Sequence, residues 1–347
     1  MDVRLSPEQQ ALRDSAAQVV DRLGPHAVGE LDDAERSAKL DAAVAASGWR
    51  ELRTATHAGG PWASGVEVAL VAEELGRGLA DVPFLGPTLA AELRRLAGAA
   101  PAAAPETVAL GADLAALACR PHGAPAGAGV AVDALGATAA LVVVPATGGH
   151  TVARVALAGD PARLDLTRPT VALDPSAAVV ALPDGGTVVS DEGEARWTAL
   201  GLALTAADLV GAMRGAVDLA VDYARDRRQY GTPIGSFQAV QHLLADAFVA
   251  VEGSRSAALH AAWAVDALPA ADALAAAAVA KAYAARAART VCETAIQVHG
   301  GIGNTWECLA HVFLRRALLS GDILGGVGAN LDRVLDHDGI GGARGLR

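Results

Sequence analysis

The chain has 347 residues, a length that suggests two or three packed units rather than a single hydrophobic core. Its 28 lysine and arginine residues against 39 aspartate and glutamate residues give a net charge of −11, and without basic runs this composition argues against a nucleic-acid partner. The mean hydropathy of +0.31 is inflated by alanine. No uninterrupted apolar run approaches the roughly 20 residues that span a bilayer, so no membrane partner is expected.

The amino terminus, Met1 to Glu8, lacks the apolar segment of a signal peptide. The three cysteines, Cys119, Cys292 and Cys308, are few and odd in number, which is typical of a reducing cytoplasm. They lack the spacing of metal ligands, and Cys292 and Cys308 are expected to be small, buried, apolar side chains. We therefore expect a cytoplasmic protein without a metal site.

The first part of the chain has the pattern of helices. Ser6, the proline after it and Gln9 form a helix start signal, because a serine cap and a glutamine three residues later satisfy each other's backbone amides. Residues 66–79 place valine, alanine and leucine in an apolar stripe at helical spacing. The sequence therefore predicts an N-terminal helical domain over residues 1–104.

The pattern changes between residues 105 and 192. Short apolar runs, such as residues 141–144, 152–157 and 171–173, alternate with breaks at glycine, proline and aspartate. Runs of this kind are typical of strands joined by turns. We expect a small β-domain here, reduced in its number of strands.

Helical periodicity returns after residue 192 and continues to the end of the chain. Alanine, leucine and valine recur at the spacing that lets helices pack along a seam. The pattern predicts a four-helix bundle over residues 193–347. Its helices are expected at residues 197–228, 237–267, 270–299 and 306–336. Because alanine-rich helices bury little area per residue, we also expect oligomerisation to add stability.

The break between the first two of these helices contains the most informative stretch. Arg227 and Arg228 end the first helix, where cations suit the negative end of the helix dipole. Gly231, Pro233 and Gly235 make the following turn short, so the two helices should run antiparallel.

Two motifs in this region resemble signatures of the acyl-CoA dehydrogenase family. Residues 227–241 read Arg-x-x-Tyr-Gly-x-Pro-Ile-x-x-Phe-Gln-x-x-Gln. Residues 297–303 read Gln-Val-His-Gly-Gly-Ile-Gly, and Thr-Trp-Glu follows at 305–307. The resemblance implies a mostly helical fold with a central, shortened, β-barrel-like domain between an N-terminal helical domain and a C-terminal four-helix bundle. It is strong over about residues 195–335 and poor over 105–190.

The resemblance also implies a reaction and a cofactor. Members of the family remove two hydrogens across the Cα–Cβ bond of an acyl-CoA thioester. A glutamate takes the α-proton while a hydride passes to the flavin of FAD. Each flavin lies across a subunit interface, and the neighbouring subunit holds its adenosine-diphosphate half. The positions that match those of the lending subunit are Arg227, Gln229, Gln238, Gln297, Gly300 and Gly301.

The two positions at which the family carries its glutamate hold other residues. Counting from the matching motifs gives Leu324 for the commoner position and Gly201 for the alternative, and neither can accept a proton. Asp322 is a weak candidate for a displaced base, and Asp208 and Glu307 are weighed in the same way, because a solvated or paired carboxylate is the usual state.

The ring-side motif of the family is absent as well. Where its members usually carry a Thr-Glu-Pro stretch, residues 116–121 read Ala-Leu-Ala-Cys-Arg-Pro. The chain thus retains the half-site that it would lend to a neighbour and lacks the half-site that it would use itself. This combination resembles the non-basic subunit of heterotetrameric (α2β2) acyl-CoA dehydrogenases of actinobacterial steroid degradation. Two alternatives stay open: a self-sufficient homo-oligomeric flavoenzyme with a displaced acid, and a non-catalytic scaffold subunit without flavin.

Overall fold

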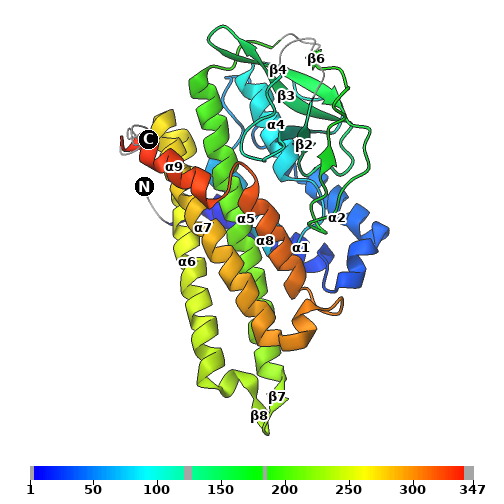
Figure 1. Ribbon diagram of the computed structural model, residues 1–347, viewed down its shortest axis with the longest axis vertical. Helices are drawn as coiled ribbons and strands as arrows, with labels where there is room; N and C mark the ends of the chain where they lie inside the picture. The colour runs from blue at the N-terminus through cyan, green and yellow to red at the C-terminus, as the bar shows by residue number, and fades with distance from the viewer. Residues whose placement is uncertain (1–3, 121–126, 183–185, 340–347) are drawn as a thin grey trace, which may run out of the picture.

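The computed structural model describes residues 4–120, 127–182 and 186–339, and it contains two groups of helices with a sheet beside them (Figure 1). The N-terminal helices begin as the sequence predicts, because Ser6 and Gln9 form the reciprocal capping box. This first group consists of α1 (Pro7–Leu23), η1 (Val28–Asp32), α2 (Ala34–Ala46), η2 (Trp49–Glu51), α3 (Gly65–Arg77) and α4 (Leu85–Leu96).

The middle of the chain forms a six-stranded sheet with the order β5-β2-β1-β3-β4-β6. β1 and β3 are parallel, and the other neighbours are antiparallel. The strands are β1 (Glu106–Gly111), β2 (Gly129–Ala131), β3 (Ala139–Ala146), β4 (Gly149–Ala156), β5 (Val171–Ala172) and β6 (Val180–Ala181).

Strand β3 explains how the sheet is held against the helices. Successive side chains of a strand point to opposite faces. Leu141 and Val143 join the main helical core, whereas Ala140, Val142 and Val144 join a smaller cluster on the other face. Both faces of this strand are therefore covered, which accounts for its continuous apolar sequence.

The C-terminal part is a helix bundle (Figure 1). The tight break predicted after Arg227 is a two-stranded hairpin that reverses the chain, so α5 and α6 pack against each other. The elements are α5 (Asp191–Asp226), β7 (Arg228–Gln229), β8 (Thr232–Pro233), η3 (Ile234–Ser236), α6 (Gln238–Ala267), α7 (Ala270–His299), η4 (Gly300–Asn304), α8 (Ala310–Asp322) and α9 (Val327–His337).

The fourth helix differs from the prediction. The sequence pattern predicts one helix over residues 306–336, but the structure has α8 and α9 with a break between them. Leu324 (φ 62°) and Gly325 (φ 92°) adopt left-handed backbone conformations, which end α8 and turn the chain. The helical side-chain spacing continues across this break, so periodicity alone does not reveal it.

Helix α5 is the central element of the bundle. By length and composition it could cross a membrane, but 94% of its most apolar window is buried inside the protein, as expected for a core helix. It packs against α3, α6, α7 and α8. Gly211 allows the close approach of α3, because a Cβ atom there would lie less than 3.0 Å from the carbonyl oxygen of Glu73.

Candidate functional site

The two positions that match those of the family's glutamate, Gly201 and Leu324, lie side by side in the structure. Gly201 lies on α5, and Leu324 lies in the break after α8. A Cβ atom built on Gly201 would lie less than 3.0 Å from Cδ1 of Leu324 and 3.5 Å from Cδ2 of Leu89. Leu324 is fully buried. The space between the two positions is therefore filled by packed leucine side chains, and only a glycine leaves room for them on α5.

The backbone around Leu324 is fixed by hydrogen bonds. Its N–H donates to the carbonyl oxygen of Leu114 over 2.7 Å, and its own carbonyl oxygen accepts from Nη1 of Arg333 over 2.7 Å. On the other side, Nε1 of the buried Trp197 donates to the carbonyl oxygen of Leu89 over 2.9 Å. These contacts hold the apolar cluster in place from three separate elements.

The three carboxylates weighed as displaced bases lie in different surroundings. Asp322 is exposed at the end of α8, and Glu307 is exposed before it. Asp208 is buried on α5 and bound by Arg168 and Arg316. Burial alone would raise the pKa of Asp208, but the two guanidinium groups hold it well below its usual range. A carboxylate this firmly ionised and paired is a poor proton acceptor.

Asp208 belongs to a buried polar network that the sequence analysis missed. Ser320 donates to its Oδ2 over 2.7 Å, and Arg168 also contacts the Ser320 hydroxyl over 2.6 Å. Lys281 on α7 is fully buried and donates to the carbonyl oxygen of Ser320. The network joins α5, α7, α8 and the segment before β5. A lysine within the alanine-rich face of α7 is the one sequence signal that could have indicated it.

The six residues predicted to hold a cofactor are all exposed and lie toward one end of the bundle. Three belong to the α5–α6 turn or the start of α6, and the other three to the end of α7 and η4. The ring of Tyr223 on α5 stacks on His299 at the end of α7 with a centroid distance of 4.5 Å, which joins the two regions. β7 and β8 mark this end in Figure 1. Their role in binding stays a prediction.

The turn that carries Arg227 has a defined geometry. The backbone N–H of Arg227 caps α5, and its carbonyl oxygen accepts from Ile234 over 2.8 Å. Tyr230 (φ 49°) and Gly231 (φ 82°) are the left-handed pair that a two-residue hairpin requires. Within the described residues, no hydrogen bond or ion pair engages the exposed Arg227 guanidinium.

The sequence comparisons identify the relatives of the chain. Residues 6–96 match the model of the acyl-CoA dehydrogenase N-terminal domain, and residues 199–330 match that of the C-terminal domain. Acyl-CoA dehydrogenase IpdE2 of Mycobacterium tuberculosis is 33% identical over 329 residues, which cover 91% of this chain and 93% of the relative. The chain belongs to the acyl-CoA dehydrogenase family.

Solved structures of the same family have the same fold. A chain of the ChsE4-ChsE5 complex from Mycobacterium tuberculosis is 25% identical with a TM-score of 0.74, and the match covers 100% of both chains. A chain of a variant Tcur3481-Tcur3483 steroid ACAD has a TM-score of 0.79 at 24% identity, covering 97% of this chain and 99% of that one. The acyl-CoA dehydrogenase fold thus extends over the whole chain, including the reduced middle part.

The residues fit one half of the FAD that the family uses. At the bundle end, Arg227 offers an exposed guanidinium, and a Cβ atom on Gly300 or Gly301 would have nothing within 4 Å. Such a surface suits a pyrophosphate group, which arginine and backbone amides bind.

The stretch that should face the flavin ring does not fit. Ala118 N–H donates to the carbonyl oxygen of Ala109, and Arg120 N–H donates to that of Val143, so both amides are used within the sheet. Leu117 is buried in the main core. Pro121, the last residue of the stretch, lies outside the described residues. No side-chain hydroxyl is available in residues 116–120 to contact a flavin ring.

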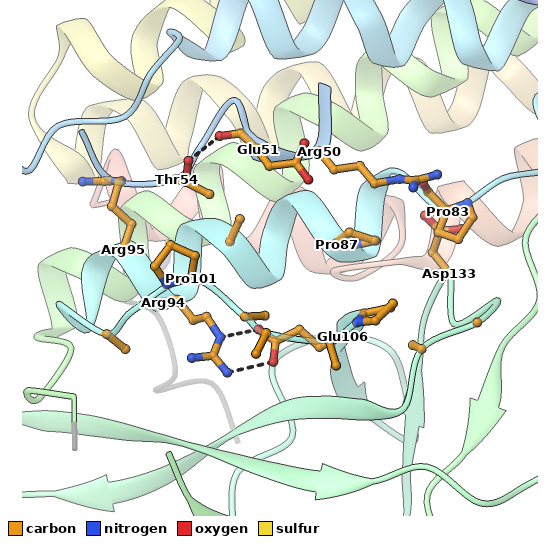
Figure 2. A pocket seen from close by; sticks show the side chains of 18 of the residues that line it. Arg50, Glu51, Thr54, Pro83, Pro87, Arg94, Arg95, Pro101, Glu106 and Asp133 are labelled. Atoms are coloured by element: carbon orange, nitrogen blue, oxygen red, sulfur yellow. Dashed lines mark hydrogen bonds and ion pairs between the residues drawn. The ribbon is translucent and has the colours of Figure 1, made fainter. Parts of the chain in front are cut away.

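A cavity lies away from all of these residues. Its volume is about 430 Å³, and it lies between η2, α4 and the segments 99–106 and 133–137 (Figure 2). Several of its charged groups are paired within the protein, since Arg94 binds Glu106 and Arg50 binds Asp41. Small apolar side chains of alanine and proline make up much of the remaining lining.

No group of three or more histidine, cysteine, aspartate or glutamate side chains within the described part of the chain could hold a metal ion.

Proposed function

We propose that this chain is a subunit of a heteromeric, FAD-dependent acyl-CoA dehydrogenase, that it lacks a catalytic base of its own and that it completes the flavin site of a related subunit. The observation that carries the proposal is the contact between Gly201 and Leu324, since an apolar side chain stands where a carboxylate would take the α-proton. The exposed group of six residues at the bundle end supports the second half of the proposal.

In the assembled enzyme, the bundle end of this chain would bind the adenosine-diphosphate half of the partner's FAD. Arg227 would pair with the pyrophosphate through its planar fork of donors, and the backbone at Gly300 and Gly301 would approach it closely. Gln229, Gln238 and Gln297 would supply amide hydrogen bonds around it. FAD, when bound, supplies the acceptor for the hydride that leaves the acyl chain.

The substrate would be an acyl-CoA thioester, and the site of reaction would be cytoplasmic. The related solved structure described as a steroid ACAD supports a bulky, steroid-like acyl group. A subunit without a base suits an α2β2 assembly, because each complete site then needs one chain of each kind.

Activity and flavin content test the proposal together. We expect the purified chain alone to have little dehydrogenase activity with any acyl-CoA, because general-base catalysis contributes ~10²–10⁴-fold in rate. Co-expression with a glutamate-bearing homologue should give an active complex with about one FAD per two chains, since the ring-side contacts of this chain are missing. Absorbance spectra and steady-state assays of both preparations measure this.

Other outcomes would favour the alternatives. Robust turnover by the isolated chain would point to a displaced acid, and loss of that activity in Asp322→Asn would identify it. One FAD per chain in the complex would contradict the description of residues 116–120 as unable to hold a flavin ring. A complex without flavin would indicate a scaffold.

A further inference from the structure

The cavity between η2, α4 and the segments 99–106 and 133–137 has a mainly apolar wall (Figure 2). Alanine and proline side chains line it, such as Pro87 and Ala91 on α4 and Pro101 in the first segment. Its volume of about 430 Å³ falls within the roughly 300–1,000 Å³ that is common for sites of small molecules. The body of a ligand bound here would therefore contact mostly apolar groups.

The cavity also contains charged side chains, and most of them are paired. Each of its three arginines binds a carboxylate. The pairs are Arg50–Asp41, Arg94–Glu106 and Arg95–Glu92. Two lining carboxylates, the exposed Glu51 and the buried Asp133, form no ion pair with any residue that the structure describes. The charges left without a paired partner are therefore both negative.

Asp133 is the buried member of these two, with an exposed fraction of 2%. Its Oδ2 accepts hydrogen bonds from the backbone N–H groups of Phe84 and Gly86 at the start of α4, over 2.7 and 3.2 Å. Its Oδ1 accepts no hydrogen bond from the described part of the chain. The charge of Arg168 interacts with that of Asp133, but the guanidinium itself is bound to Asp208. Since buried charged groups are normally paired, one oxygen of Asp133 remains open to a donor in the cavity.

We propose that this cavity binds a small molecule with an apolar body and a protonated amino group, and that Asp133 binds the amino group. The ammonium donates a hydrogen bond to Oδ1 of Asp133, and a hydrogen bond between two charged groups is stronger than one between neutral groups. The hydrocarbon part lies against the alanine and proline wall, where its removal from water favours binding. An anionic ligand is disfavoured, because the arginines already have partners. The inference does not rest on the proposed function, since the cavity lies away from the bundle end.

Three probes of equal chain length test what the cavity recognises. Isothermal titration calorimetry measures the binding of n-octylamine, octan-1-ol and octanoate to the purified chain. We expect octylamine to bind at one site and roughly tenfold or more tightly than octanol, because its charge strengthens the hydrogen bond to Asp133. Octanoate should bind most weakly. Equal affinity for octylamine and octanol, or tighter binding of octanoate, would overturn the proposal.

The variant Asp133→Asn separates binding of the amine from the structural role of Asp133. The amide oxygen of asparagine can still accept from Phe84 and Gly86, and asparagine also tolerates the left-handed backbone at this position (φ 51°). The variant should therefore fold, lose roughly tenfold or more in affinity for octylamine, and bind octanol as the wild type does. Glu51→Gln is the matched control, because it removes the exposed carboxylate and should change the affinity for octylamine less than about threefold. Unchanged binding of octylamine to Asp133→Asn would contradict the role given to Asp133.

A cavity-filling variant tests the location without altering Asp133. Ala91 lines the cavity from α4, and leucine is a good helix former, so Ala91→Leu should keep the helix. Its larger side chain should fill part of the cavity and weaken the binding of both octylamine and octanol roughly tenfold. Ala11→Leu, at an exposed position of α1, should leave both affinities unchanged. Circular dichroism during thermal denaturation checks that each variant is folded. Wild-type affinity for octylamine in Ala91→Leu would place the amine elsewhere and refute the proposal, even if Asp133→Asn failed to fold.

Discussion

At the scale of single residues, Gly201 and Leu324 are complementary in shape. Because Gly201 has no side chain, the side chain of Leu324, from a distant part of the chain, fills the space beside it. Neither residue is unusual in the local sequence. Counting from the family motifs located both positions, but their contact depends on tertiary packing that no local pattern encodes.

This complementarity predicts strong coupling between the two positions. Gly201→Ala should lower the free energy of unfolding by ~1–3 kcal/mol, because an added methyl group overpacks a core that hydrogen bonds hold rigid. Leu324→Ala alone should cost ~2–5 kcal/mol through the cavity it leaves. Urea denaturation of the two variants and their combination measures the coupling. The double variant should lose less than the sum of the single variants.

A control for this measurement is Gly328→Ala. Gly328 lies in α9, and a Cβ atom there would meet nothing within 4 Å. Alanine is the better helix former, so this variant should be neutral or slightly more stable. Additive effects of Gly201→Ala and Leu324→Ala would contradict the packing described for Leu324.

At the scale of elements, the sequence predicted helices better than their interruptions. The extents of α6 and α7 agree with the predicted ranges closely, because each begins beside a turn or proline and carries uninterrupted periodicity. The break between α8 and α9 was missed, although Gly325 and the glycine after it follow Leu324 directly. The geometry of this break depends on two hydrogen bonds. The Leu324 N–H donates to the carbonyl oxygen of Leu114, and Arg333 donates to the carbonyl oxygen of Leu324. Similarly, the Asp208 network joins segments that lie far apart in the sequence.

The hairpin between α5 and α6 carries the prediction that belongs to this scale. In the assembled complex, Arg227→Ala should weaken FAD binding about 10- to 150-fold, because a charge-assisted hydrogen bond contributes ~1.5–3 kcal/mol. Arg227→Lys should restore only part of this affinity, since a point charge cannot reproduce a bidentate fork. Flavin content and the dissociation constant of FAD are the measurements.

Arg228 offers the matched control on the same hairpin. It is also exposed, but it is the first residue of β7 and follows the end of α5 rather than capping it. Arg228→Ala should therefore change FAD affinity little. Equal affinity in wild type and Arg227→Ala would mean that the hairpin serves only to reverse the chain, and the scaffold alternative would gain support.

At the scale of the whole molecule, the core of the bundle and its end differ in how much they are exposed to solvent. The bundle core is closed by Leu324 and by a polar network that ties four segments together. The bundle end leaves Arg227 and the glycines of η4 exposed to solvent. A closed core and an open end are what a subunit needs if it stabilises another subunit's site without hosting a reaction itself.

The buried network makes the stability of the molecule depend on pH through Lys281. Burial lowers the pKa of this amine to about 7, even though Asp208 and Asp322 favour its charged form. In the unfolded chain the pKa returns to about 10.4. Between these values the unfolded state binds more protons than the folded state, so the free energy of unfolding should rise with pH from about 7 toward 10. Below that window the cost of burying a charge is fully present.

Urea denaturation at several pH values between 7 and 9.5 measures this slope. Lys281→Met should flatten it and should make the protein more stable at pH 7, because the variant removes a buried ionisable group. The other lysine of the chain provides the control, since Lys39 is exposed and paired with Glu35. Lys39→Met should keep the slope of the wild type within this window. An unchanged slope in Lys281→Met would show that the amine stays charged in the core, held by Asp208 and the carbonyl oxygen of Ser320.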